Sequence, residues 1–356
     1  MNKFKKFLSG WHDKRIVYTL ITTGCASILG GLSTSLWLTS IIHLANEKLN
    51  ANIPIPGAEV DYISMAVGTL VGLILINKGL KLRMSNLTTK KRIIQIQHSS
   101  IEGVNFTNTR DDLGEYEVIP LNINQYQELK EVNQFNLQMA WKKQEHMVDN
   151  LRAHINEGLS EIAYMGLAHI PFQFLLGYQI SDKTDIKFYE WNRTEKIWMR
   201  LSEKERSFSK LLLIKDESKQ DADSVEEVVV KVGITTEVLD SQLEGHGLET
   251  LNSYYLKLES PEMDAINSTK QLNAYKKQFR ELLSELHNKY QNLKKVHIFI
   301  SAQPSLTYSF GSSISARMDS NKEFWIYNYI GSSTVKYPWA LKISQKIENG
   351  DIKIHN

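Results

Sequence analysis

The amino-acid sequence predicts two parts, an α-helical transmembrane hairpin followed by an α/β cytoplasmic domain of two Rossmann-like halves. Two long stretches without Asp, Glu, Lys or Arg, residues 16–46 and 62–77, predict the hairpin. A strand-helix-strand pattern that occurs twice, in residues 163–191 and 297–329, predicts the paired halves.

Both apolar runs are long enough to suggest membrane helices. A helix needs about 20 apolar residues to cross the hydrocarbon layer. The first run meets this length, and the second does so if Lys78 and Lys81 extend their charged ends to the interface. Residues 1–92 are therefore predicted to be a membrane module with transmembrane helices at about 16–44 and 62–82. A cleaved signal peptide is the alternative for the first run, but its apolar region is usually only about 7–15 residues long.

The charge distribution sets the predicted orientation. Residues 78–92 carry six Lys or Arg and no acid, whereas the loop at 47–61 has a net charge of -2. By the positive-inside rule, both termini and the large domain are cytoplasmic. Residues 93–356 hold 30 basic and 36 acidic side chains, which disfavours a broad nucleic-acid-coating surface. The only cysteine, Cys25, excludes a disulfide-stapled secreted fold.

Small residues recur every four positions in both apolar runs. Gly31 belongs to such a stripe in the first run, and Ser64, Gly68 and Gly72 form one in the second. Stripes of this kind let helix backbones approach closely in a membrane. These four residues are therefore predicted to pack membrane helices, with a polar pore-lining face as the alternative.

The remaining elements follow from apolar periodicity. Residues 93–160 are predicted to be connecting strands and a long helix that lead into the core of the domain at 161–356. Strands are expected at 92–97, 116–123, 211–214, 228–232, 254–258 and 296–300, and helices at about 125–158 and 272–293. The acidic stretch at 216–227 is predicted to be a solvated loop.

The repeated pattern has a chemical consequence. In each copy a buried strand meets a proline, Pro171 or Pro304, and a short helical stretch then reaches Gly177 or Gly311. Proline is favoured at the first helical position, and a helix start beside a strand end suits a phosphate. Two copies about a pseudo-twofold axis are therefore expected to present two helix starts to one ligand.

Aromatic and basic side chains near the repeat are candidates for stacking on bases and for binding phosphates. They are Trp191, Trp198, Tyr308, Trp339, Arg193, Arg200, Arg317 and Lys336. Core packing is the alternative for each aromatic residue, because large aromatic side chains are mostly buried. His169, just before Pro171, is likewise either a structural residue or a ligand.

At these residues the chain resembles the SAVED domain, the sensor module of effectors in bacterial cyclic-oligonucleotide antiphage signalling (CBASS). The matching residues are 166–172, 176–177 and 188–190 in the first copy and 302–304, 310–311 and Tyr327 in the second. The resemblance implies two fused CARF-like halves that form a SAVED domain. Its two-helix amino terminus is similar to the transmembrane class of these effectors.

The resemblance also implies a function. The ligand is expected to be a cyclic di- or trinucleotide made by a partner nucleotidyltransferase. Binding is expected to drive homo-oligomerisation and disruption of the bacterial inner membrane, so the lipid bilayer is a further partner and the chain a multi-pass protein there. Candidate ligand-binding residues at the motifs are Phe172, Gln173, Gln303, Ser305 and Leu306, while Trp198, Arg317 and Lys336 are chosen for their stacking or charge.

Two other functions remain open. The domain could be a membrane-anchored enzyme that degrades the cyclic nucleotide, or the chain a membrane scaffold that needs no ligand. The sequence contains no Gly-x-Ser-x-Gly, His-Glu-x-x-His or Walker-type loop, so we expect no catalytic residues, metal or cofactor.

Overall fold

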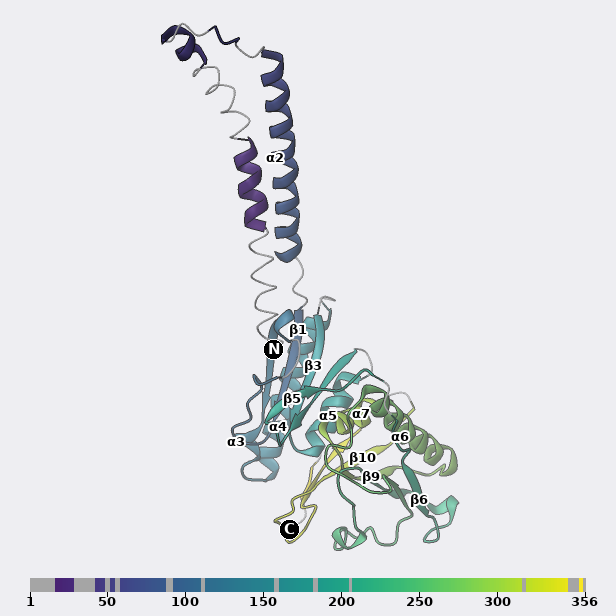
Figure 1. Cartoon of the computed structure of the whole chain (residues 1–356). Coiled ribbons are helices and arrows are strands. Elements are labelled where there is room, and N and C mark those ends of the chain that lie inside the picture. Colours follow the sequence, from purple (N-terminus) through teal and green to yellow (C-terminus); the bar gives the residue numbers. More distant parts are fainter. Residues whose placement is uncertain are drawn as a thin grey trace. The chain divides into compact units, whose positions relative to one another are not determined.

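The computed structural model forms two compact units, Met1–Lys90 and Lys91–Asn356 (Figure 1). The structure describes residues 17–28, 42–48, 52–54, 58–87, 92–109, 113–156, 160–181, 185–204, 207–315, 318–344 and 352–354.

The first unit contains two helices that pack through glycines. One helix spans residues 17–28 and the other is α2 (Ala58–Leu87). A Cβ atom on Gly72 would lie 2.6 Å from the carbonyl oxygen of Gly24, and one on Gly24 would lie 2.8 Å from that of Gly72. The predicted packing residue Gly72 thus lies at a helix contact within the chain, and Gly68 is half-buried. Gly31 and the side chain of Ser64 lie outside the described residues.

The predicted transmembrane hairpin is wrong. Of the helices that the structure describes, none has both the length and the apolar character needed to cross a membrane. In α2 the charge-free stretch covers only the 16 residues 62–77, which is shorter than the roughly 20 that a span requires. In the first run, residues 29–41 lie outside the described residues. The multi-pass inner-membrane location and the bilayer partner that rested on this hairpin are corrected with it.

The first half of the second unit is a five-stranded sheet with its helices. Its strand order is β2-β1-β3-β4-β5, and every pairing is parallel except that of β4 with β5. The strands are β1 (Arg92–Ser99), β2 (Glu117–Asn124), β3 (Ser160–Leu167), β4 (Ile186–Asn192) and β5 (Ile197–Arg200). The helices are η1 (Leu113–Glu115), α3 (Tyr126–Leu129), α4 (Gln134–Asn156) and α5 (Ile170–Ile180).

The second half is a seven-stranded sheet with the order β12-β11-β10-β9-β7-β8-β6. The strands are β6 (Leu212–Asp216), β7 (Glu227–Gly233), β8 (Ser253–Lys257), β9 (Lys295–Ser301), β10 (Glu323–Asn328), β11 (Trp339–Ile343) and β12 (Ile352–Ile354). The helices are η3 (Ala222–Ser224), η4 (Asp240–Gln242), α6 (Thr269–Lys289) and α7 (Pro304–Ser312). The four central strands β8, β7, β9 and β10 are parallel, and the other pairings are antiparallel.

The internal repeat is longer than the two sequence motifs. The order β2-β1-β3-β4-β5 recurs as β8-β7-β9-β10-β11, with the same parallel and antiparallel senses. Helix α4 corresponds to α6, and α5 corresponds to α7. The strands and long helix expected as a connection at 93–160 therefore complete the first half, while β6 and β12 are additions to the edges of the second.

Helices α5 and α7 join the halves through the two repeat glycines. A Cβ atom on Gly177 would lie 1.9 Å from the carbonyl oxygen of Tyr308, and one on Gly311 would lie 1.9 Å from that of Phe174. Because residue 177 faces 308 while 311 faces 174, the two helices run antiparallel. Their amino termini therefore point in opposite directions, and the two helix starts do not face each other across one ligand.

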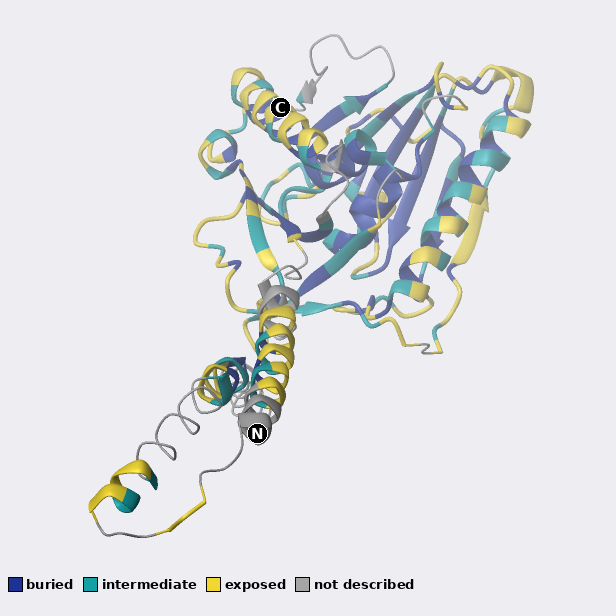
Figure 2. Ribbon diagram, turned by 90° about the horizontal axis from the view of Figure 1, so that it is seen from above, coloured by how far each residue is buried: buried dark blue, intermediate teal, exposed yellow. Residues whose placement is uncertain are grey.

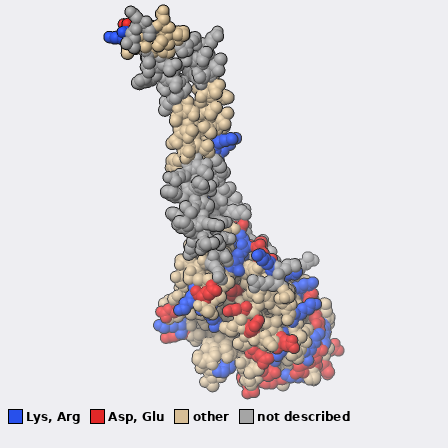
Figure 3. Space-filling model, in the orientation of Figure 1, with Lys and Arg blue, Asp and Glu red and all other residues tan. Residues whose placement is uncertain are grey.

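Burial follows this architecture. The inner strands of both sheets and the α5–α7 pair are buried, whereas the edge strand β6 and one face of α6 are exposed (Figure 2). Apolar residues of both halves pack in one core, including Phe174 and Leu175 of α5 with Phe310 of α7. Acidic and basic side chains are interspersed over the visible face of the second unit (Figure 3).

Candidate ligand-binding site

The start of α7 is built from residues of both halves. Gln303 precedes the helix in an extended conformation, and Pro304 fixes the first turn. The Gln303 amide accepts a hydrogen bond from the Ile266 N–H at 2.5 Å and donates one to the Ile266 carbonyl at 3.1 Å. This pair of bonds holds the segment before α6 against the helix start.

A carboxyl group from the first half already occupies the α7 amino terminus. The Ser305 N–H donates a 2.9 Å hydrogen bond to Glu190 Oε1, and Glu190 lies in β4, two residues before the strand ends. Burial raises the pKa of Glu190 to about 7, against the lowering effect of the hydrogen bond from Ser305, and the negative charge of Asp264 raises it further. A phosphate could bind this helix start only by displacing Glu190.

Beside Glu190 lies a cavity of about 240 Å³, which we call the α7 pocket. The first half contributes Glu190, Trp191, Asn192, Met199, Arg200, Leu201 and Ser202, and the second half contributes Asp264, Ile266, Asn267 and Gln303. The lining thus combines an indole, hydrogen-bonding carboxyl and amide groups, and the Arg200 guanidinium, which also pairs with Glu203. Such a mixture suits a flat heterocycle with polar edges better than it suits a phosphate alone.

The start of α5 is the pseudo-equivalent position, and it is filled. In the strand registers Glu190 faces Met199, and the corresponding pair in the second half is Asn328 facing Trp339. The Trp339 ring is fully buried and lies 5.8 Å from the His169 ring and 6.0 Å from that of Phe172, measured between ring centroids.

Polar groups at the α5 start also differ from those at α7. His169 takes the place of Gln303, and the backbone N–H of His169 donates to the Ser100 hydroxyl at 2.8 Å. Burial lowers the pKa of His169 to about 4, so its ring is neutral at pH 7. The repeat therefore provides one open pocket, at α7, and one closed position, at α5.

The candidate residues predicted from the sequence fall into three groups. Gln303 lines the α7 pocket, and Ser305 contributes the N–H that binds Glu190. Phe172, Leu306 and Trp198 are fully buried, and the Trp198 indole donates to the Asn105 carbonyl at 2.8 Å.

The others lie elsewhere. The Gln173 amide donates to the Ala168 carbonyl at the α5 start, 2.5 Å away. Lys336 donates to the carbonyls of Gly331 and Ser333, which fixes the turn before β11. Arg317 lies outside the described residues.

Sequence reasoning did not select Glu190, Asp264 or Asn267. The position of Glu190 inside the first motif was an available signal, because Glu190 is an acidic residue in the aromatic strand of that motif. Asp264 and Asn267 carry no comparable signal, since they reach the pocket only through the bonds between Gln303 and Ile266.

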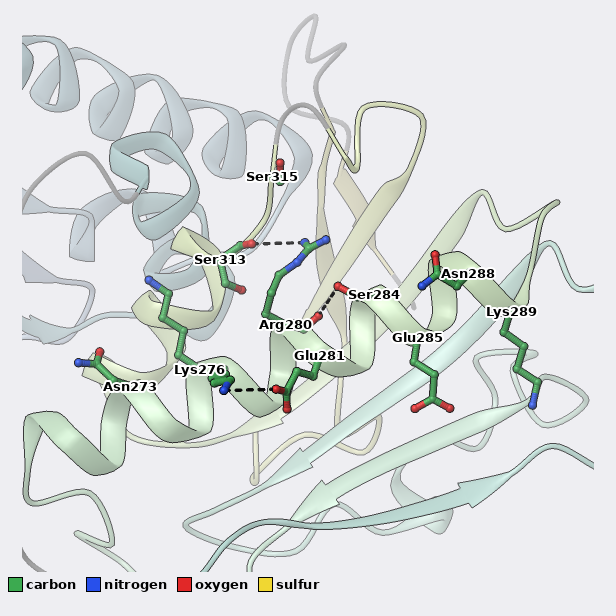
Figure 4. Close-up of a pocket in the computed structure, with 11 residues that line it drawn as sticks. Asn273, Lys276, Arg280, Glu281, Ser284, Glu285, Asn288, Lys289, Ser313 and Ser315 are labelled. Carbon is green, nitrogen blue, oxygen red and sulfur yellow. Dashed lines mark hydrogen bonds and ion pairs between the residues drawn. The ribbon is translucent and has the colours of Figure 1, made fainter.

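Two other hollows are weaker candidates. A hollow of about 1090 Å³ lies along the exposed face of α6 (Figure 4). Two of its cations are engaged by acids of the same chain, since Arg280 contacts Asp319 at 2.6 Å and Lys289 contacts Glu217 at 2.5 Å. A phosphate would have to compete with these acids.

The second hollow, of about 550 Å³, lies at the carboxyl ends of β1 and β2. No Lys or Arg is among the described residues that line it. In the described part of the chain, no group of three or more His, Cys, Asp or Glu is arranged to hold a metal ion.

Comparison with known proteins gives a family. The sequence model of the SAVED family, described as "SMODS-associated and fused to various effectors sensor domain", matches residues 144–343, which is more than half of the chain. All residues that line the α7 pocket fall within this match. No curated protein matches the chain.

Several solved structures are similar to this chain. The Cap4 SAVED/CARF-domain containing receptor of Acinetobacter baumannii with the cyclic trinucleotide 2'3'3'-cAAA is 13% identical, with a TM-score of 0.46, over 84% of this chain and 63% of that chain. The same receptor with 3'3'3'-cAAA is 13% identical, with a TM-score of 0.45, over 84% and 64%. The Cap4 receptor of Moraxella osloensis is 14% identical, with a TM-score of 0.44, over 84% and 62%. The chain therefore spans less than two thirds of these relatives.

Proposed function

The chain belongs to the SAVED family, and from this premise we propose that it senses a cyclic oligonucleotide, which binds at the α7 pocket. The observation that carries this proposal is the position of the pocket between the two halves of the SAVED domain. A ligand that contacts both halves, and binds one of their relative arrangements more tightly than another, shifts the population toward that arrangement, which is what a sensor needs.

The pocket lining supports recognition of a base. Trp191 provides a stacking surface, and base–aromatic stacking is typically worth about 1–3 kcal/mol. The carboxyl oxygens of Glu190 and Asp264 are acceptors for an exocyclic amino group, as on adenine. A volume of 240 Å³ is below the roughly 300–1,000 Å³ of ordinary ligand pockets, so one base would enter while the rest of the ring stays outside.

The charge of the lining supports the same division of roles. Arg200 is the one cation that lines the α7 pocket among the described residues, and it is partly exposed. We therefore assign Arg200 to a phosphate at the rim and Glu190 to a base inside. The raised pKa of Glu190 favours its neutral form, which lowers the repulsion of an anionic ligand.

The response to the ligand is the second part of the proposal. Occupation of the pocket favours one arrangement of the halves and thereby the association of chains in antiphage defence. We propose that the chain binds its nucleotide without degrading it.

A panel of cyclic di- and trinucleotides tests this function. We expect at least one compound to raise the melting temperature of the full chain and to be recovered intact after incubation. Arg200→Ala should reduce this stabilisation, and Arg152→Ala, which removes an exposed Arg paired with Asp149, should not. Turnover of the compound would favour a degrading enzyme, and silence across the panel would favour a scaffold that needs no ligand.

A further inference from the structure

Strand β6 forms an outer edge of the second sheet and presents aliphatic side chains to solvent. Leu212, Leu213 and Ile214 are 46%, 37% and 51% exposed. Strand β8 pairs with one side of β6, and among the described residues no strand pairs with the other. Three consecutive exposed aliphatic residues on an open edge are not explained by packing within the sheet.

An open edge of this kind is usually protected. It exposes unpaired backbone N–H and C=O groups, and natural proteins block such edges with proline or charge. The outer strand of the first sheet follows this rule, because Pro120 removes a backbone donor in the middle of β2. Strand β6 contains no proline, and its two charged residues, Lys215 and Asp216, lie at its carboxyl end.

The two faces of β6 have different surroundings. Lys215 forms an ion pair with Glu285 of α6, so the odd-numbered side chains of β6 face that helix. Because side chains alternate along a strand, Leu213 lies on the α6 face, while Leu212 and Ile214 lie on the other. Any strand added to this edge must match both faces.

The β6 sequence is complementary to itself in the antiparallel direction. A twofold axis normal to the sheet keeps each side chain on its own face of the sheet. Two residues that face each other across the axis are therefore both even-numbered or both odd-numbered, because side chains alternate between the faces. An axis at Leu213 places Leu212 opposite Ile214, Leu211 opposite Lys215, and Lys210, two residues before the strand, opposite Asp216 of a second copy, with each pair formed twice. Moving the axis by one residue either way places Asp216 opposite an apolar residue and removes both ion pairs.

We propose that β6 is a homodimer interface, in which two copies of this chain pair their β6 edges antiparallel about a twofold axis at Leu213. The occupant is a second copy because one segment carries both charges in the required positions, on either side of an apolar centre. The two sheets then form one continuous sheet. The same surface of each copy contacts the other, as a twofold interface requires. This interface shares no residue with the α7 pocket and needs no nucleotide, so it stands or falls independently of the sensing function.

Sedimentation equilibrium of the full chain without nucleotide tests the proposal by charge exchange. Lys210→Asp and Asp216→Lys each replace two opposite-charge pairs with two like-charge pairs, and we expect each to raise the dimer dissociation constant about tenfold. The double variant restores opposite charges and should return the constant to near the wild-type value. A monomer at every concentration, or a dimer that both single variants leave unchanged, would overturn the interface.

A cross-link tests the register directly. The chain has a single cysteine, so Cys25→Ser removes the only native thiol, and one new cysteine can then be introduced at a chosen position. Leu213→Cys should oxidise to a disulfide-linked dimer, because facing residues at the axis have Cα atoms about 4.5–5.5 Å apart, within disulfide range. Lys277→Cys, on the exposed face of α6, should not. Equal cross-linking of both variants, or of neither, would contradict the register.

Discussion

The contact between α5 and α7 makes Gly177→Ala a sharp test of how the two halves are joined. An ordinary contact of a Cβ atom begins at 3.4 Å, whereas this one would lie 1.9 Å from the Tyr308 carbonyl oxygen and 2.9 Å from the Ser312 nitrogen. The helices must therefore separate by about 1.5 Å, the difference between 3.4 and 1.9 Å. The obstacle is backbone, which cannot rotate away as a side chain can.

The cost of this separation can be estimated. Overpacking a core typically costs about 1–3 kcal/mol, and a clash with helix backbone belongs at the upper end. Alanine recovers up to about 1 kcal/mol through its higher helix propensity. We expect the free energy of unfolding to fall by about 2 kcal/mol, measured by urea denaturation followed by tryptophan fluorescence.

Matched variants complete this test. Gly114 has open space where a Cβ atom would lie, so Gly114→Ala should stay within about 0.5 kcal/mol of the wild type. The double variant of Gly177 and Gly311 should cost less than the sum of the two single variants, because a pair of helices already forced apart accepts the second methyl more easily. If Gly177→Ala is as stable as Gly114→Ala, the close helix contact does not exist.

Three further predictions concern buried ionisable groups. Burial raises the pKa of Glu190 from 4.5 to about 7, so the wild type loses stability as pH rises through that interval. The free energy of unfolding of Glu190→Gln, measured in urea, should therefore rise by about 3 kcal/mol relative to that of the wild type between pH 4.5 and 8. Burial lowers the pKa of His98 from 6.5 to about 4, so the wild type loses stability as pH falls from 6.5 to 4. His98→Gln should reduce that loss by about 3 kcal/mol, measured from thermal unfolding at a series of acidic pH values. Asp319→Asn should cost about 2 kcal/mol in thermal unfolding, because Asp319 is only 2% exposed and accepts a 2.6 Å bond from Arg280; a neutral result would show that the pair is not formed.

The repeat was predictable because its two halves have proline and glycine at similar positions. A proline at each helix start and a glycine in each helix mark α5 and α7, and the glycines prove to be the contact points of the crossing. The long helix was less predictable. The single helix expected at 125–158 is divided into α3 and α4, and between them the Asn133 side chain accepts a hydrogen bond from the Asn136 N–H at 2.9 Å and caps α4.

The full extent of the repeat and the details of the site could not be predicted from local patterns. Strand β1 reads RIIQIQHS and its counterpart β7 reads EVVVKVG, which share apolar character but almost no residues. Trp198 is buried because the backbone near Asn105, more than 90 residues earlier, covers it. Its exclusion from the α7 pocket therefore depends on a long-range contact that stacking chemistry alone does not indicate.

The difference between the two helix starts is the feature that defines the site. Identical halves would provide two pockets, but Trp339 occupies at α5 the place that Met199 leaves partly open at α7. The equivalent positions Glu190 and Asn328 also differ, since the first carries a carboxyl group and the second an amide. The proposed ligand position therefore occurs once per chain.

A calorimetric titration of the full chain with the cyclic oligonucleotide found in the panel tests whether the α7 pocket is the sensing site. We predict saturable binding of one ligand per chain, weakened at least about tenfold by Trp191→Leu because the stacking surface is lost. Trp325→Leu, which shortens a half-buried indole of β10 away from the pocket, should bind as the wild type does. Equal affinity of the Trp191 variant and the wild type would contradict the assignment of the α7 pocket as the sensing site.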